Sequence, residues 1–430
     1  MGGGGRQRGR KEEGFYIPED VMVSILGRLP VKSLLRFKCV CKLWLSLISN
    51  PNFVESHLSY QNNKDPQILV ATPTDHHRKI VIDSIVLRGD ATEITHKLTV
   101  HDIPLDSFEM LLSCNGIVCF YGVIYIHVCN PSTREFRTLP PATPRIRLFQ
   151  DRSINYLEQV GLGQDQVTKE YKVVRLFKRE EYNGSRNLFM EGEVFTLGKE
   201  RPGLWRGIGA TPFQSAVVPP CFANGALHWL THENFPTEKS KVISFDLHDE
   251  KFRLLPHPSC CSNPSKTWAS RFLLILRGCL CLGDRIADSQ LDIWTLRDYH
   301  SPNSMWVKEY EINLETNKID GYGPYMYPPI YPIAVHMNGN FCLTLEGERL
   351  YYYDLRSNSF RNVDYRRPSQ LIYDPWSNSF CNVNYSNHSE LICYIDASYH
   401  QSTVTMSVDF IPTEYVDSLV SLFGRRYPTC

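Results

Sequence analysis

Residues 17–48 read IPEDVMVSILGRLPVKSLLRFKCVCKLWLSLI, and they contain three short helical patterns with almost no loop between them. The first pattern runs from Glu19 to Leu29 and ends at Pro30, because proline disfavours helical geometry in the residue before it. Each pattern places apolar residues at helical spacing: Val21, Ile25, Leu26 and Leu29, then Leu34, Leu35, Phe37 and Val40, then Leu43, Trp44, Leu47 and Ile48. Domains below about 40 residues usually need a metal, a disulfide or a partner. The stretch therefore predicts a small all-α unit that presents apolar surface to something else.

The same stretch resembles an F-box from end to end. The resemblance rests on Pro18-Glu19-Asp20, Ile25-Leu26, Arg28-Leu29-Pro30, Val31-Lys32-Ser33-Leu34, Arg36-Phe37, Val40-Cys41-Lys42, Trp44 and Ile48. It implies binding to a Skp-type adaptor, and through it to a cullin, in a ubiquitin ligase. The residues that it assigns to the adaptor are Pro18, Ile25, Leu29, Pro30, Leu34, Leu35, Val40 and Trp44. The alternative is an ordinary helical subdomain packed on the rest of the chain, which would bury Leu29 and Leu34.

The composition indicates a reduced protein without affinity for polyanions. The chain has 430 residues, enough for a small module and a large domain. Lys plus Arg and Asp plus Glu number 46 each, so the net charge predicts neither nucleic-acid nor membrane binding. The N-terminal residues have no apolar core and do not read as a signal peptide. We therefore expect the 14 cysteines to be thiols, and we expect the chain in the cytoplasm and also in the nucleus.

The helical patterns end near residue 60. Asn50 and Pro51 predict one more short helix, since Asn50 can cap free N–H groups and Pro51 suits the first helical position. From residue 67 the apolar period changes to two, which predicts short β-strands. The predicted division has five parts: a disordered tail (1–14), the F-box helical domain (15–60), a linker (61–66), a β-propeller-like domain (67–424) and a C-terminal tail (425–430).

Asn-Gly and Arg-Gly turns recur through the β-region. Asn-Gly is a strong hairpin signal because both residues accept positive φ. Such turns stand at residues 115–116, 224–225, 277–278 and 338–339. The last three recur about every 50–60 residues, near the period of kelch-type blades with four strands. The predicted fold class is multidomain: a small all-α domain of three helices followed by a large all-β, β-propeller-like domain of about six to seven blades.

The β-region resembles the F-box-associated domain of plant F-box proteins, of the S-locus F-box-like kind. The resemblance rests on residues 169–174 (KEYKVV), 291–294 (LDIW) and 415–420 (YVDSLV). It implies a non-catalytic substrate-recognition subunit, in which the F-box docks the adaptor and the propeller binds a target protein for ubiquitination. The S-locus likeness implies a secreted S-type ribonuclease (S-RNase) as the target, in self-incompatibility.

The sequence shows no catalytic or metal-binding pattern. It contains no G-x-S-x-G, H-E-x-x-H or C-x-x-C motif, and Gly161-Leu162-Gly163 lacks the third glycine of a phosphate-binding loop. His76-His77 has no partner at ligand spacing. We therefore expect no catalytic residue, no metal and no cofactor. The alternative function is a glycan-binding module or an enzyme whose site assembles from distant loops on one rim of the propeller.

A local duplication interrupts the blade pattern. Residues 353–365 return as residues 373–385, and Tyr-Asp, Ser-Asn-Ser-Phe and Asn-Val recur in the same order. The repeat is too short for a blade and fits one hairpin. We expect the first copy to occupy the blade and the second to be surplus. Residues 322–332, YGPYMYPPIYP, are expected to form a surface loop, because proline cannot donate a hydrogen bond to a central strand.

Overall fold

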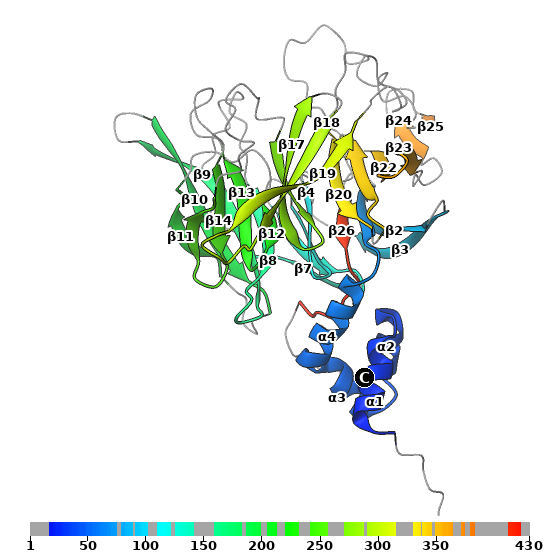
Figure 1. The fold of residues 1–430 in the computed structure, drawn as a ribbon. Coiled ribbons are helices and arrows are strands. Elements are labelled where there is room, and N and C mark those ends of the chain that lie inside the picture. The colour runs from blue at the N-terminus through cyan, green and yellow to red at the C-terminus, as the bar shows by residue number, and fades with distance from the viewer. Residues whose placement is uncertain are drawn as a thin grey trace, which may run out of the picture.

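A helical unit lies beneath a ring of β-sheets in the computed structural model of the chain (Figure 1). The structure describes residues 17–74, 79–88, 91–101, 110–121, 125–141, 159–182, 186–198, 204–212, 220–231, 241–256, 271–287, 290–314, 330–336, 338–345, 349–363, 371–374, 379–382 and 412–422. The predicted tails and His76-His77 lie outside these residues. Within the described ranges, no helix has the length and apolar character needed to cross a bilayer.

Four helices form the helical unit in the described part of the chain: α1 (Glu19–Gly27), α2 (Val31–Phe37), α3 (Lys42–Ser49) and α4 (Pro51–Asn62). Pro30 separates α1 from α2, and its carbonyl accepts hydrogen bonds from the N–H groups of Ser33 and Leu34 at 2.9 and 3.1 Å. The predicted start of α4 is confirmed. Asn50 Oδ1 accepts the Asn52 N–H at 2.9 Å, and Pro51 occupies the first turn.

The described strands include six four-stranded antiparallel sheets, which are the blades of a propeller. From the inner strand outward, blades I and II contain β26 (Pro412–Tyr415), β1 (Gln67–Thr74), β2 (Lys79–Arg88) and β3 (Ala91–His101), then β4 (Met110–Cys114), β5 (Ile117–Tyr121), β6 (Ile126–Asn130) and β7 (Glu135–Thr138). Blades III and IV contain β8 (Gln159–Gln164), β9 (Tyr171–Tyr182), β10 (Arg186–Thr196) and β11 (Arg206–Ala210), then β12 (Cys221–Ala223), β13 (Ala226–Thr231), β14 (Lys241–Asp246) and β15 (Lys251–Leu254). Blades V and VI contain β16 (Arg271–Leu276), β17 (Cys279–Ala287), β18 (Gln290–Arg297) and β19 (Met305–Asn313), then β20 (Ile330–Val335), β21 (Phe341–Leu345), β22 (Arg349–Asp354) and β23 (Ser359–Val363).

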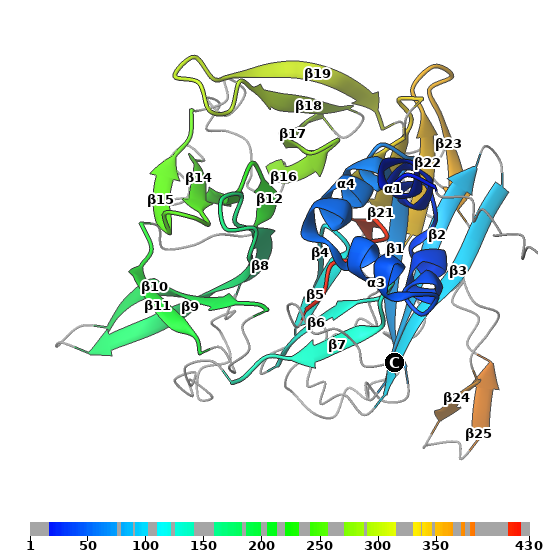
Figure 2. The same ribbon diagram turned by 90° about the horizontal axis from the view of Figure 1, so that it is seen from below.

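The six inner strands close into a ring. They contact one another in the order β26, β4, β8, β12, β16, β20 and back to β26, and Figure 2 shows the blades around this ring from below. Blade I joins the two ends of the domain, because β26 pairs with β1 from Gln67↔Tyr415 to Val70↔Pro412. The predicted propeller is confirmed, with a blade count of six.

Each pair of neighbouring blades shares one apolar cluster of buried side chains, which gives six clusters around the ring. The cluster between blades IV and V, for example, contains Leu230, Leu280 and Leu296. Gly161 lies on β8 in blade III, where a Cβ atom would stand 2.6 Å from Leu227 Cδ1 in blade IV. The Gly-x-Gly motif therefore allows two blades to pack closely.

The predicted turns connect the first and second strands of their blades. Asn115 and Gly116 have φ of 51° and 79° between β4 and β5, and similar positive values recur at residues 224–225 and 277–278. Positive φ at both positions is the geometry of a type I′ hairpin turn. The Asn-Gly and Arg-Gly signals therefore placed the first hairpins of blades II, IV and V correctly.

The duplication separates into two sheets. The first copy provides β22 and β23 of blade VI, whereas β24 (Leu371–Asp374) and β25 (Ser379–Asn382) form a two-stranded sheet outside the six blades. Tyr353↔Phe360 in the blade corresponds to Tyr373↔Phe380 in the second copy. The prediction that the first copy occupies the blade is confirmed, and the second copy lies outside it.

The prediction of a loop over residues 322–332 is wrong for residues 330–332. These residues begin β20, the inner edge strand of blade VI. Pro332 lies at a register shift of that strand, where a proline does not break a ladder hydrogen bond of a central strand.

Candidate functional site

The helical unit buries a small apolar core and leaves other apolar side chains in solvent. Its core contains Leu26, Val31, Leu34, Ile48 and Phe53. The large apolar side chains that remain 47 to 60 % exposed are Ile17, Val21, Ile25, Val40 and Leu43. Val21 and Ile25 are four residues apart on α1, so they share one helix face. This exposed apolar surface is the strongest candidate for a protein-binding site.

The residues predicted to bind an adaptor are divided between surface and core. Pro18, Ile25, Pro30 and Val40 are exposed, and Leu29, Leu35 and Trp44 are half-buried. Leu34 is fully buried in the core of the helical unit and has no surface to offer a partner. Ile17, Val21 and Leu43 were not among the residues predicted to bind the adaptor, although the helical spacing of Val21 and Ile25 was a usable signal.

Trp44 connects three of the helices. Its ring lies 5.1 Å from the Phe37 ring on α2, and its Nε1–H donates to the Met22 sulfur on α1 at 3.2 Å. His57 on α4 contacts the Leu29 carbonyl through Nε2 at 2.9 Å. These contacts fix the bend at Pro30 and hold α1 and α2 in one arrangement.

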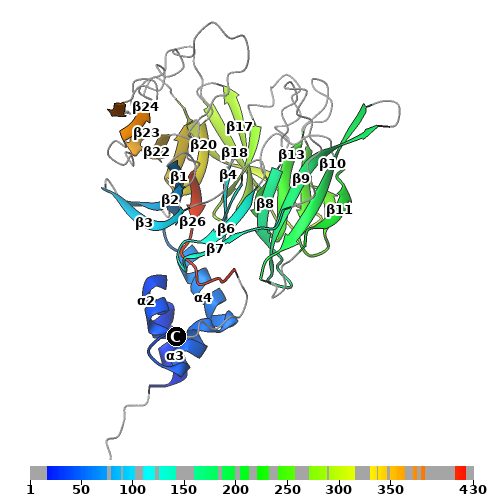
Figure 3. The same cartoon turned by 180° about the vertical axis from the view of Figure 1, so that it is seen from behind.

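The chain end that follows β26 runs to the helical unit, and we call residues 416–422 the C-terminal strap. Asp417 in the strap accepts hydrogen bonds from Lys97 Nζ and Ser132 Oγ at 2.9 and 2.6 Å. Burial acts to raise the pKa of the Asp417 carboxyl, but the Lys97 charge and these hydrogen bonds outweigh it and hold the pKa below its usual range. The strap is thus anchored to blades I and II, and Figures 1 and 3 show it between the propeller and α4.

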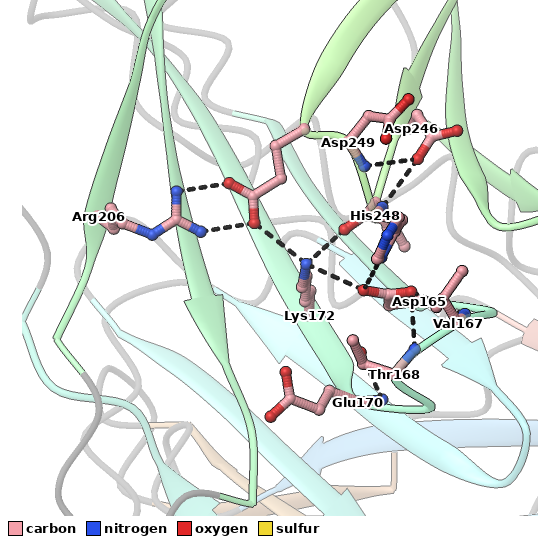
Figure 4. Close-up of polar contacts among 11 residues, drawn as sticks. Asp165, Val167, Thr168, Glu170, Lys172, Arg206, Asp246, His248 and Asp249 are labelled. Atoms are coloured by element: carbon pink, nitrogen blue, oxygen red, sulfur yellow. Dashed lines mark hydrogen bonds and ion pairs between the residues drawn. The ribbon is translucent and has the colours of Figure 1, made fainter.

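A polar cluster joins blades III and IV (Figure 4). The buried Lys172 ammonium donates to the Leu247 carbonyl, to Asp165 Oδ2 at 3.3 Å and to Glu250 Oε1 at 3.1 Å. Arg206 pairs with the same Glu250 carboxylate at 2.5 Å. With two cations and two carboxylates, the cluster is balanced in charge. We interpret it as a structural joint between blades.

Asp165 in this cluster also shapes a turn. Burial acts to raise the pKa of its carboxyl, but hydrogen bonds from the Thr168 and Val167 N–H groups and from His248 outweigh it and hold the pKa well below its usual range. The same turn presents Lys169, whose ammonium lies 2.9 Å from Glu55 Oε1 on α4. The turn between β8 and β9 therefore faces the helical unit.

Comparison with known proteins finds matches over both parts of the chain. The F-box domain family matches residues 16–56, and the F-box associated beta propeller domain family matches residues 75–389. F-box protein At3g07870 of Arabidopsis thaliana is 26% identical over 79% of this chain and 83% of its own length. F-box/kelch-repeat protein At3g23880 of the same plant is 29% identical over 68% of this chain and 78% of its own length. F-box protein At1g11270, also from this plant, is 30% identical over 66% of this chain and 87% of its own length.

Proposed function

Because the chain belongs to the plant F-box proteins with an F-box-associated β-propeller domain, we propose that it is the substrate-recognition subunit of a Skp-cullin-F-box ubiquitin ligase. The observation that supports this most directly is the exposed apolar surface of the helical unit. Ile25 and Val40 stand 53 and 60 % exposed beside the buried core, and neither belongs to that core. Full burial of an exposed aliphatic side chain is worth about 1.5–3 kcal/mol, so covering the exposed part of each of these gives roughly half of that.

We propose that the adaptor-binding surface consists of exposed and half-buried residues: Ile17, Pro18, Val21, Ile25, Leu29, Pro30, Leu35, Val40, Leu43 and Trp44. Leu34 acts from the core by supporting α2, and Trp44 also supports the packing of α1 and α2 against α3. Pro30 sets the angle between α1 and α2, which determines how the apolar groups meet the partner.

The family does not require catalysis by this chain. A subunit that holds the adaptor at one end and a target at the other raises the local concentration of the target beside the ubiquitin-charged enzyme, and such proximity is worth several kcal/mol of barrier. We propose the propeller as the target-binding part, in the cytoplasm and nucleus. For the target, the likeness of residues 169–174, 291–294 and 415–420 to S-locus F-box-like proteins supports an S-RNase, and affinity purification after proteasome inhibition would identify it.

The test is a titration of the full chain with a recombinant Skp-type adaptor. The double variant Ile25→Asp, Val40→Asp places two charges on the proposed surface and should weaken binding at least about a hundredfold, because each unpaired charge would be desolvated. Since both side chains are exposed in the free chain, far-ultraviolet circular dichroism should remain unchanged.

The matched control is Leu254→Asp, which replaces a side chain of similar exposure (66 %) on the outer strand β15 of blade IV. The control should bind the adaptor with wild-type affinity. Equal affinity of the double variant and the control would show that the adaptor binds elsewhere or not at all.

A further inference from the structure

The core of the F-box contains one residue from the far end of the chain. Leu419 in the C-terminal strap is 5 % exposed and belongs to the same apolar cluster as Leu26, Leu34, Ile48 and Phe53. The other buried members of that cluster come from α1, α2, α3 and α4. The F-box is therefore assembled from two segments that are separated by the whole propeller.

The strap is fixed to the propeller immediately before and after Leu419. The buried Asn130 amide donates to the Ser418 carbonyl at 3.1 Å and to the Val420 carbonyl at 2.8 Å. Both backbone neighbours of Leu419 are thus held by one side chain at the end of β6. This arrangement leaves Leu419 no freedom to leave the F-box core while blade II is intact.

Further contacts secure the end of the strap. The Glu135 carboxylate on β7 accepts the Leu422 N–H at 2.6 Å and the Ser421 hydroxyl at 2.9 Å. The Leu422 side chain is fully buried in the cluster between blades II and III. Two leucines of the strap therefore enter different cores, Leu419 in the F-box and Leu422 in the propeller.

The turn beneath the strap leaves no room for a side chain. A Cβ atom on Gly116 would lie 2.5 Å from Ser418 Oγ and 2.6 Å from the Val416 carbonyl oxygen. The strap thus lies directly on the first hairpin turn of blade II. The Lys169–Glu55 ion pair also links the propeller to the helical unit, but it is half exposed on both sides, and exposed ion pairs contribute little.

We propose that the C-terminal strap is part of the adaptor-binding unit, with Leu419 as a positioning residue that completes the F-box core and fixes the F-box on the propeller. The F-box alone is too small to bury a stable core. Leu419 supplies apolar volume to that core. The hydrogen bonds of the strap to Asn130 and Glu135 hold Leu419 on the propeller, so they fix the orientation of α1–α4 relative to the propeller. Adaptor binding at one end of the chain then depends on residues that follow the last strand. This inference rests on the proposed function, since it concerns the same adaptor surface.

The test compares variants of the full chain in adaptor titration and in amide hydrogen exchange. Leu419→Ala should weaken adaptor binding at least about tenfold and speed exchange in α2 and α4, because it leaves a cavity in the F-box core. Leu419→Met keeps the apolar volume and should restore both values to near wild type. Val420→Ala is the matched control, since Val420 packs against the propeller cluster and should change neither value.

Two outcomes would overturn the proposal. Leu419→Ala that binds the adaptor within about twofold of wild type would show that the strap is dispensable. Weaker binding with unchanged exchange in α2 and α4 would show that Leu419 touches the adaptor itself. If Leu419→Ala does not fold, the same two measurements are made on Asn130→Ala, which removes the hydrogen bonds on both sides of Leu419 and leaves the F-box residues unchanged. Failure of the wild-type chain to bind the adaptor would instead refute the proposed function.

Discussion

His228 illustrates how single buried groups connect the blades. This fully buried residue on β13 contacts the Cys221 carbonyl through Nδ1 at 3.1 Å and the Tyr299 hydroxyl through Nε2 at 2.6 Å. The neutral ring satisfies both contacts if Nδ1–H donates to the carbonyl and Nε2 accepts from the hydroxyl. Burial lowers the pKa of His228 to about 4, against the opposing effect of the Cys221 carbonyl.

The propeller should therefore lose stability in mild acid through His228. The unfolded chain binds a proton at this histidine near pH 6.5, whereas the folded chain does so only near pH 4. The contribution is complete above pH 6.5 and falls by about 3 kcal/mol as the pH drops through this window. The free energy of unfolding, measured with urea, should fall less between pH 7 and pH 4.5 for His228→Gln than for wild type. Equal differences would contradict the assignment.

Replacement of Lys172 should lower the free energy of unfolding substantially. In Lys172→Met the buried Asp165 carboxylate loses its ammonium partner, and breaking a buried ion pair from one side typically costs about 3–5 kcal/mol. Lys169→Met is the control, because its pair with Glu55 is exposed and should matter by less than about 1 kcal/mol. Urea unfolding at neutral pH gives both values. Similar stability of the two variants would show that the cluster is not a structural joint.

At the scale of elements, local signals determined which parts of the structure could be predicted. The proline and asparagine positions gave the helix boundaries at Pro30 and Pro51, because these residues act on their own backbone. Blade III was not recognised as a repeat, since its first hairpin turns through Asp165–Glu170 and lacks Asn-Gly. Blade I was hidden because β26 pairs with β1 across most of the sequence.

The site was predictable to a smaller extent than the fold. Helical spacing identifies an apolar face but cannot decide which apolar residue enters the core. Leu34 and Leu35 are neighbours in the same pattern, yet only Leu34 is fully buried. The role of Leu419 had one usable signal, the apolar character of residues 415–423, YVDSLVSLF, after the last predicted strands. Its partner segment lies some hundreds of residues away, so no local pattern could reveal the contact.

The second copy of the duplicated hairpin should be dispensable. Deletion of residues 366–385 removes β24 and β25 and leaves all four strands of blade VI. Loop closure changes by only about 0.6 kcal/mol per doubling of length, so the melting temperature should shift by less than about 2 °C. Deletion of residues 290–309, which removes β18 and part of β19, is the control of equal length and should give insoluble protein. A large loss of stability in the first deletion would show that the second copy supports the propeller.

At the scale of the whole molecule, ring closure makes the propeller one cooperative body. Each blade shares a core with both neighbours, and blade I exists only when β26 joins β1–β3. We propose that the division near residue 67 separates a propeller that can fold without the helices from an F-box that cannot fold without the propeller. The propeller contains its own six interblade cores, whereas the F-box needs Leu419.

A fragment of residues 65–430 should therefore fold without the helices. It retains β26 and all strands of the ring, so circular dichroism should show β-structure without appreciable helix. The strap in this fragment would expose Leu419, which should cost about 1.5–3 kcal/mol at most. A matched fragment of residues 65–411 lacks β26 and should lose cooperative unfolding. Equal thermal transitions of the two fragments would contradict the closure by β26.

The closure of blade I by β26 also determines how late during synthesis the propeller can finish folding. About 310 residues separate β3 from β26, and a ribosome working at about 5–20 residues per second needs roughly 15–60 s to make them. During this interval the inner edge of β1 has no strand to pair with, and the F-box core lacks Leu419. Exposed edges and unfilled cores attract other chains. The nascent protein is therefore open to wrong association until β26 emerges, and a chain that terminates before β26 has neither a closed propeller nor a complete F-box core.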